Sequence, residues 1–247
     1  MSAEPTSHRW LPDLTPVNLG PRVLGGFTGR VTGSALTVAT QAALRRYARV
    51  PVVTVKQIHG AGVIHLDAPP EASGEIGRAD AIILSTPGVA GAILTADCVP
   101  LLLAADGAGQ RADHRSPDRS PLVAAVHVGR RGLFAGIVPR VLAELTARGA
   151  MAGEVRAAIG PGICGACYEV PADMAAEAAR ITPEARTQTR RGTAGIDLAA
   201  AIQAQLAAAG VYQITVDPRC TFTDPTLFSY RREGAAAGRQ AALIQMR

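Results

Sequence analysis

Two histidines and one cysteine stand at the ends of apolar, β-branched segments, where predicted strands turn into loops. They are His59, Cys98 and His127, and the adjoining segments are residues 52–58, 89–95, 101–105 and 122–128. If these strands pair in one sheet, their ends converge and bring the three side chains together. Two imidazoles and a thiolate are ligand types that zinc prefers, and three protein ligands leave a fourth coordination position for water. Zinc lowers the pKa of such a water to about 7, which provides hydroxide at neutral pH.

The same residue types are compatible with other interpretations. In one, both histidines satisfy their hydrogen bonds in the core beside a buried cysteine. In another, His127 activates Cys98 as the nucleophile of a metal-free amide hydrolase. Asp97, next to Cys98, could orient a histidine or relay a proton, and a structural role is an equal alternative. The spacing alone leaves these interpretations open.

The remaining cysteines include a lone C-x-x-C, formed by Cys164 and Cys167 in a glycine-rich segment. Cys220 lies farther along the chain, and no second C-x-x-C completes zinc-ribbon spacing. Four cysteines in 247 residues also do not make a disulfide framework. We interpret the C-x-x-C as reduced cysteines in a turn, with a redox or metal-binding role as the alternative.

The composition predicts a chain with a substantial buried core. Of 247 residues, 48% are hydrophobic and 18% are charged, which excludes a disordered or linker protein. The most apolar stretch, residues 88–105, contains Asp97 and Pro100, so we interpret it as buried strands and not as a membrane span. The first ten residues lack the basic-then-apolar pattern of a secretory signal. We therefore expect a soluble, cytoplasmic protein without a membrane partner.

The basic residues favour a small anionic ligand over a nucleic acid. The formal net charge is +5, and Lys56 is the only lysine. The arginines occur in scattered pairs without a long basic run, and aromatic residues make up only 4% of the chain. Nucleic-acid interfaces more often combine a basic stripe with interleaved aromatics. Guanidinium groups also bind phosphates and carboxylates bidentately.

Strands outnumber long helices among the elements that must position these side chains. Helical spacing of apolar residues predicts helices over residues 35–49, 133–148, 171–180 and 197–209. The predicted strands are residues 52–58, 62–66, 79–85, 89–95, 101–105, 122–128, 155–159 and 212–216, a segment around Phe228, and 238–245 as a strand or short helix. The predicted connections are 67–77, a Pro87–Gly88 turn, a charged surface loop at 106–121 and a tight basic turn at 129–132. Because the strands come in runs, the pattern predicts the α+β class.

Nine short motifs occur in order from about residue 52 to the end of the sequence. They are KQIHG (56–60), ADAIILS (79–85), LTADCVPLLLAAD (94–106), HVGRRG (127–132), AAIGPGICGACYEV (157–170), DL (197–198), CTFTD (220–224), FSYRR (228–232) and GRQAALI (238–244). Together they resemble the YfiH-like family, also called the laccase-domain or polyphenol oxidase family. This family includes bacterial, zinc-dependent purine nucleoside phosphorylases.

The resemblance implies a metal centre and an activity. The family's zinc ligands are the histidine of QxHG, the cysteine of ADC and the histidine of HxGWRG, which fall on His59, Cys98 and His127. The implied reaction is phosphorolysis of inosine, adenosine or guanosine to the free base and ribose 1-phosphate. The family is also credited with deamination of adenosine and cleavage of methylthioadenosine. The implied partners are therefore a purine nucleoside, phosphate and Zn²⁺.

Other residues in the matching segments are candidates for contacts with the substrate or for support of the ligands. The candidates for substrate binding are Asn18, Arg131, Arg231, Arg232 and Arg239. Gln57 and Asp97 neighbour the implied ligands and are candidates for supporting them. Structural ion pairs are the alternative for each arginine.

The resemblance also implies a layered α/β/β/α fold with mixed sheets, in agreement with the α+β class. We expect one domain over residues 1–247, as a monomer or small homo-oligomer. Residues 1–50 match the family poorly, and residues 106–121 are interpreted as a surface loop insertion. The motif HVGRRG departs from the family's HAGWRG, because Arg130 replaces tryptophan and Val128 replaces a small residue.

Two further functions are alternatives to the phosphorylase. The first is a copper-binding protein of the polyphenol oxidase type. Five histidines cannot supply the several copper centres of a laccase, although Cu(II) competes with zinc at most nitrogen and sulfur sites. The second is a non-catalytic partner protein in cell-envelope quality control that keeps the metal site, and the departure at Arg130 favours it.

Overall fold

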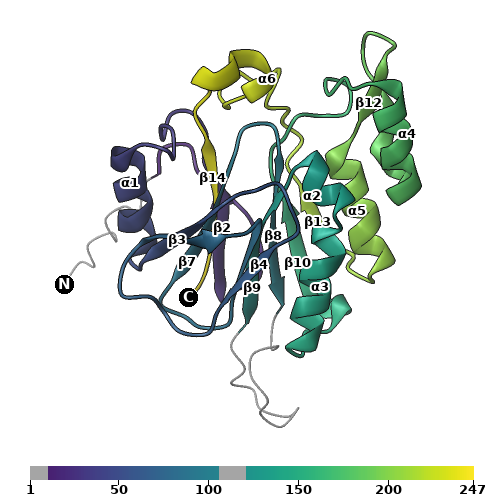
Figure 1. Cartoon of the computed structure of the whole chain (residues 1–247). Helices are drawn as coiled ribbons and strands as arrows, with labels where there is room; N and C mark the ends of the chain where they lie inside the picture. The colour runs from purple at the N-terminus through teal and green to yellow at the C-terminus, as the bar shows by residue number, and fades with distance from the viewer. Residues whose placement is uncertain (1–10, 106–120) are drawn as a thin grey trace, which may run out of the picture.

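The computed structural model describes residues 11–105 and 121–247, so residues 106–120 of the predicted loop lie outside the described residues. Two six-stranded sheets, each mixing parallel and antiparallel pairs, form the centre of the molecule (Figure 1). In spatial order, the first sheet consists of β1 (Thr15–Pro16), β2 (Val23–Phe27), β14 (Gln240–Met246), β7 (Ala90–Thr95), β3 (Val52–Lys56) and β5 (Gly74–Arg78). The second consists of β13 (Gln213–Val216), β10 (Val155–Ile159), β8 (Val99–Ala105), β9 (Leu122–Val128), β6 (Ala81–Leu84) and β4 (Val63–Leu66). A separate hairpin pairs β11 (Arg186–Gln188) with β12 (Ala194–Ile196).

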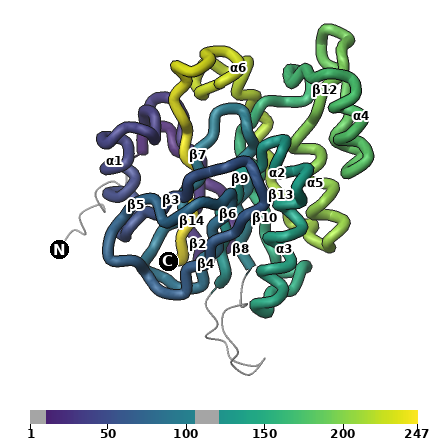
Figure 2. The backbone as a smooth tube through the Cα atoms, viewed as in Figure 1, coloured from purple at the N-terminus to yellow at the C-terminus, as the bar shows by residue number. Residues whose placement is uncertain are grey.

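Helices flank the two sheets. They are α1 (Val38–Ala48), α2 (Arg130–Phe134), α3 (Ile137–Ala147), α4 (Ala172–Ile181), α5 (Leu198–Ala208) and α6 (Tyr230–Glu233). The tube drawing in Figure 2 shows α1 on one side of the strands and α3, α4 and α5 on the other. Within the described ranges, no helix is long and apolar enough to span a membrane.

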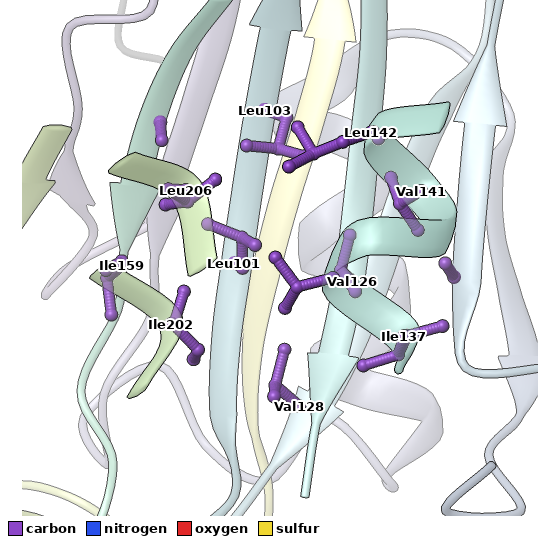
Figure 3. Packing of buried hydrophobic residues seen from close by; sticks show 14 of the residues in the cluster. Leu101, Leu103, Val126, Val128, Ile137, Val141, Leu142, Ile159, Ile202 and Leu206 are labelled. Atoms are coloured by element: carbon purple, nitrogen blue, oxygen red, sulfur yellow. The ribbon is translucent and has the colours of Figure 1, made fainter. Parts of the chain in front are cut away.

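Three apolar clusters hold the layers together. Phe27 and Leu102 belong to the cluster buried between the two sheets. Leu101 and Leu103, which alternate with Leu102 along β8, pack instead against α3 and α5 (Figure 3). Leu44 of α1 belongs to the third cluster, on the outer face of the first sheet. The order of layers is therefore α/β/β/α, as predicted, and burial of β8 on both faces explains its uninterrupted apolar sequence.

Tertiary pairing overrides three local predictions. Residues 79–85 and 89–95 both contain strands but do not pair as a hairpin, because β6 joins the second sheet and β7 joins the first. The connection predicted at 67–77 contributes to β5, an edge strand. The strand predicted around Phe228 is wrong, because this residue lies in no strand and the chain enters α6 two residues later.

The predicted helix at 133–148 is divided into α2 and α3. Gly136 separates them with a φ of 77°, a left-handed conformation that glycine adopts without steric cost. The basic turn predicted at 129–132 instead begins α2, which starts at Arg130 immediately after β9. Helix α2 therefore holds Arg130 close to the histidine near the end of β9.

Candidate functional site

His59, Cys98 and His127 form a compact cluster, although they come from different parts of the chain. Their ligand atoms all lie within 4.8 Å of one another. His59 follows β3 of the first sheet, His127 lies in β9 of the second, and Cys98 lies where the chain crosses from β7 to β8. The two imidazole rings meet edge-on, with centroids 4.8 Å apart. The three side chains therefore meet, but the expectation that their strands pair in one sheet is wrong, because β3 and β7 belong to the first sheet and β8 and β9 to the second.

The backbone around the cluster is strained at two positions. His59 has a φ of 58° and Asp97 has a φ of 90°, which are unusual for residues other than glycine. Such conformations cost about 1–3 kcal/mol each and persist only where surrounding contacts enforce them. The Asp97 carbonyl oxygen accepts a hydrogen bond from the N–H of Ile163 at 2.9 Å, which fixes the turn that presents Cys98.

Asp80 organises both histidines. Its fully buried carboxylate accepts hydrogen bonds from the backbone N–H groups of Ile58, His59 and Gly60, at 3.3, 2.9 and 2.7 Å. It also lies 2.8 Å from Nδ1 of His127. A carboxylate that holds Nδ1 fixes the orientation of the ring and leaves Nε2 free to bind a metal ion. Asp80 is not among the residues predicted from the sequence, although its place directly before a buried strand in ADAIILS is a usable signal.

The charges of the cluster are coupled. Burial raises the pKa of Asp80, but hydrogen bonds from His127 and from backbone N–H groups outweigh it and lower that pKa overall. Burial lowers the pKa of His127, but Asp80 and Cys98 outweigh burial and raise it to about 9. Burial raises the pKa of Cys98, but the two imidazoles outweigh it and lower that pKa to about 6. Without a metal ion the cluster is therefore a thiolate beside an imidazolium, and a cation can replace the imidazolium proton.

Gly129 leaves the space that the cluster needs. A Cβ atom at this position would lie 2.9 Å from Nδ1 of His59 and 3.0 Å from Sγ of Cys98. Real Cβ atoms essentially never approach other atoms below 3.0 Å, so a side chain here would displace the ligands. Only the assembled structure reveals this requirement, because Gly129 resembles an ordinary turn glycine in the sequence.

The cluster opens into a cavity of about 570 Å³, a volume typical of small-molecule sites. Among the described residues, four with basic side chains line it, namely Lys56, Arg130, Arg231 and Arg239. Two acidic residues, two tyrosines, two neutral polar residues and several aliphatic side chains complete the lining among the described residues, namely Glu75, Asp97, Tyr168, Tyr230, Gln57, Thr95, Leu36, Val55, Leu94, Ala96, Ile163 and Leu198, beside the three cluster residues. The cavity therefore combines a cationic wall with apolar and aromatic surface beside the cluster.

The candidate substrate-binding residues divide into two groups. Arg231 and Arg239 line the cavity, whereas Arg131, Arg232 and Asn18 do not. Arg131 is exposed on α2, and Asn18 is exposed with its side-chain oxygen accepting a hydrogen bond from a neighbouring backbone N–H.

The Arg232 guanidinium is engaged with the protein itself. It donates hydrogen bonds to four backbone carbonyl oxygens, those of Thr221, Phe222, Asp224 and Leu227. It also pairs with the Glu233 carboxylate at 2.7 Å. These contacts tie α6 to the preceding loop.

Asp97 and Gln57 support loops and do not contact a histidine side chain in any bond that the structure gives them. The Asp97 carboxylate accepts hydrogen bonds from Oγ1 of Thr221 and from the N–H of Arg231, both at 2.6 Å. The Gln57 amide pairs with the backbone N–H and carbonyl of Leu94 at 2.9 and 2.8 Å. The hydrogen bonds of Asp97 thus hold loops together, and Asp80 is the carboxylate that contacts the His127 ring.

Comparison with solved structures places the fold among known proteins. The chain superposes on a protein of Neisseria meningitidis with a TM-score of 0.78 and 26% identity, covering 95% of this chain and 99% of that one. It superposes on YfiH of Bacillus licheniformis with the same TM-score and 21% identity, covering 96% and 97% of the two chains. At 21% identity, the similarity to the Bacillus licheniformis protein shows only a shared fold.

Proteins related in sequence align with most of the chain. A purine nucleoside phosphorylase of Mycobacterium tuberculosis is 43% identical over 195 residues, which is 79% of this chain and 72% of the relative. A purine nucleoside phosphorylase of Streptomyces coelicolor is 39% identical over 223 residues, 90% and 86% of the two chains. Residues 30–247 match the family model described as multi-copper polyphenol oxidoreductase laccase, and the chain belongs to this family.

Proposed function

We propose that this chain is a metal-dependent purine nucleoside phosphorylase. In this reaction a phosphate oxygen bonds to C1′ of the ribose, the bond from C1′ to the base nitrogen breaks, and the base leaves with a proton. The observation that carries the proposal is the opening of the His59, Cys98 and His127 cluster into a cavity with four basic side chains. The names of the relatives from Mycobacterium and Streptomyces support the same reaction class.

The cationic wall suits the phosphate. Arg130, Arg231 and Arg239 can each offer a planar pair of donors to phosphate oxygens, and Lys56 adds a compact charge. Arg231 is also held in place, because its guanidinium lies over the Tyr168 ring and donates to the Glu169 carbonyl oxygen at 3.3 Å. A guanidinium ordered before the ligand arrives loses less conformational entropy on binding.

The apolar lining suits a purine. Val55, Leu94, Ile163 and Leu198 give the cavity an aliphatic surface, and Tyr168 adds an aromatic one. Small-molecule sites typically combine such a surface with a few polar groups that fix orientation. We assign the aliphatic surface to the base and the cationic wall to the phosphate.

The donor set suits Zn²⁺, the metal that we propose for the site. Two imidazoles and one thiolate are a recognised zinc ligand set, and Asp80 already holds His127 as metal-bound histidines are held. When bound, zinc would supply Lewis acidity and a water of lowered pKa, the chemistry that deamination of adenosine needs. We extend the proposal to adenosine deamination and methylthioadenosine cleavage as further activities of this site.

A single assay separates this function from its alternatives. Zinc-loaded protein is incubated with inosine, with and without phosphate, and hypoxanthine and ribose 1-phosphate are measured. We expect phosphate-dependent release of both products, abolished in His59→Ala and retained in His65→Ala, whose ring lies beside Glu144 outside the cavity. Hypoxanthine release without phosphate would indicate a hydrolase. No release from zinc-loaded protein would overturn the proposal.

Chelation distinguishes the metal centre from a Cys98 and His127 nucleophile pair. The thiolate beside an imidazolium is the arrangement that such a pair requires, so this alternative has a structural basis. Activity that disappears with the metal and returns with added Zn²⁺ supports the metal centre. Activity that persists after complete removal of the metal supports the thiol nucleophile.

A further inference from the structure

A second cluster of metal-ligand side chains lies outside the site described above. Cys164, Cys167 and Cys220 are free cysteines, and their sulfur atoms all lie within 4.8 Å of one another. Cys220 is buried, whereas Cys164 and Cys167 are half-buried, so the cluster can be reached from solvent. None of the three cysteines lines the cavity beside His59, Cys98 and His127, which we call the nucleoside cavity after its proposed substrate. The C-x-x-C of the sequence is therefore completed by a third cysteine more than fifty residues away.

Backbone contacts fix the three sulfurs before any ligand binds. Gly162 forms a parallel bridge with Cys220, and the N–H of Thr221 donates to the Gly162 carbonyl oxygen at 3.0 Å. The N–H groups of Cys167 and of the next residue both donate to the Cys164 carbonyl oxygen at 2.9 Å, which closes a tight C-x-x-C turn. Two chain segments are thus held with their thiols facing one shared point, as in preorganised metal sites.

The surroundings favour an anionic sulfur at Cys220. The N–H of Cys164 donates to its sulfur at 3.3 Å, and although burial raises the pKa of Cys220, backbone N–H groups outweigh burial and lower that pKa overall. Burial, followed by the neighbouring sulfurs, raises the pKa of Cys164 to about 12. Three thiols this close cannot all ionise alone, but a cation bound between them relieves their mutual repulsion. Burial also raises the pKa of Cys167, and a hydrogen bond with Cys164 and the charge of Arg190 offset this only in part.

We propose that Cys164, Cys167 and Cys220 bind a second metal ion, a thiophilic d¹⁰ cation, at a site distinct from the nucleoside cavity. Soft thiolate ligands select Zn²⁺ or Cu⁺ among the metals available to proteins. Among the described residues, no histidine or acidic side chain joins the three sulfurs as a fourth ligand. Cu⁺ is satisfied by three sulfurs, whereas Zn²⁺ takes a water or small thiol in its fourth position. The Cys164 N–H that donates to the Cys220 sulfur stabilises a thiolate, which is the metal-binding form.

The second site supports the wall of the cavity. Thr221, next to Cys220, donates its hydroxyl to the Asp97 carboxylate at 2.6 Å. Ile163, next to Cys164, donates its N–H to the Asp97 carbonyl oxygen at 2.9 Å. An ion that joins Cys164 to Cys220 therefore clamps the two segments that hold the turn presenting Cys98. Its loss should loosen this wall and lower the melting temperature.

The test counts metal ions in the full chain and uses no nucleoside, so its result is independent of the proposed activity. Reduced apoprotein is loaded separately with Zn²⁺ and with Cu⁺ and then freed of unbound metal. With Zn²⁺ we expect two ions in wild type, one in Cys98→Ser, one in the double variant Cys164→Ser/Cys167→Ser, and none when all three substitutions are combined. Comparison of the two metals at the Cys98→Ser protein, by competition with a chelator of known affinity, shows which ion the second site prefers.

Co²⁺ gives a second readout that identifies the ligands. The sulfur-to-cobalt charge-transfer band of Cys98→Ser should be about three times as intense as that of Cys164→Ser/Cys167→Ser, because three thiolates bind the ion in one variant and one in the other. If the double variant does not fold, alkylation of Cys98→Ser settles the matter, since metal bound at the second site should protect all three of its remaining cysteines. A Cys98→Ser protein that binds no metal, or a disulfide within the cluster of freshly purified protein, would overturn the proposal.

Discussion

The Asp80 carboxylate accepts a hydrogen bond from Nδ1 of His127 at 2.8 Å, and both side chains are almost completely buried. Because an ionised carboxylate can only accept, Nδ1 carries the proton and Nε2 is the atom available to a metal ion. The same carboxylate holds the strained backbone of His59 through its N–H. One residue, 21 and 47 positions from the two histidines, therefore positions both of them.

Replacement of Asp80 by asparagine tests this arrangement. Asp80→Asn keeps the size of the side chain but removes its charge, and we expect the affinity of the cluster for Zn²⁺ to fall about 10–100-fold. Competition with a chromophoric chelator measures the change. Asp173→Asn, at an exposed position in the first turn of α4, is the matched control and should bind zinc as wild type does. Unchanged affinity in Asp80→Asn would show that Asp80 is only a packing residue.

A methyl group at Gly129 should expel the metal without unfolding the protein. In Gly129→Ala the new Cβ would lie within 3.0 Å of atoms in His59 and Cys98, so we expect one bound zinc fewer per chain. The cost in stability should be about 1–3 kcal/mol, as for other overpacked sites. Gly153→Ala, where a Cβ meets nothing within 4 Å, is the control. Metal analysis and thermal unfolding report the two effects, and full zinc occupancy in Gly129→Ala would contradict the geometry.

Arg130 should contribute to phosphate binding if the proposed reaction is correct. It lines the cavity at the position where the family motif has tryptophan, with its guanidinium 5.7 Å from the Phe134 ring centre. We expect Arg130→Ala to raise the KM for phosphate about tenfold, the loss of one charge-assisted hydrogen bond. Arg140→Ala, exposed on α3, should leave the KM unchanged. Equal constants in both variants would place the phosphate elsewhere in the cavity.

Arg232 should matter for stability. Its guanidinium binds four carbonyl oxygens and the Glu233 carboxylate, so Arg232→Ala leaves several acceptors without a partner. We expect the free energy of unfolding in urea to fall by about 2–3 kcal/mol, with only partial recovery in Arg232→Lys. Arg180→Ala, exposed on α4, should change it little. A raised KM for phosphate at undiminished stability would instead favour contact with the substrate.

His65 should make the fold less stable in acid. Burial, followed by the charge of Arg148, lowers the pKa of His65 below 6.5, although Nε2 lies 3.3 Å from the Glu144 carboxylate. The unfolded chain then takes up this proton at higher pH than the folded chain, so stability falls as the pH drops below 6.5. One proton accounts for at most about 1.4 kcal/mol per pH unit.

The variant His65→Gln isolates this contribution. Without the titrating ring, its stability relative to wild type should increase between about pH 7.5 and about pH 5.5, as measured by urea unfolding at each pH. A stability difference that does not change with pH would show that His65 titrates alike in the folded and unfolded chains.

Local patterns in the sequence predict most of the elements and the candidate metal ligands. Apolar periodicity located most of the strands and helices, because burial of a face imposes a repeat of two or of 3.6 residues on the local sequence. His59, Cys98 and His127 are the candidates because they stand at the ends of predicted strands, between buried segments. Polar side chains in such places must be hydrogen-bonded or bind a ligand. The nine sequence motifs indicated the family.

The contacts between distant residues depend on the three-dimensional fold and have no local signature in the sequence. The pairing of β6 with β9 places the Asp80 carboxylate under His127, and no local pattern encodes that contact. Packing also turned Arg232 toward carbonyl oxygens while Arg231 faces the cavity, although the two are adjacent in the chain. Cys220 joins the C-x-x-C for the same reason, because contacts across many residues depend on strand order and register, which are set by the burial of the whole core.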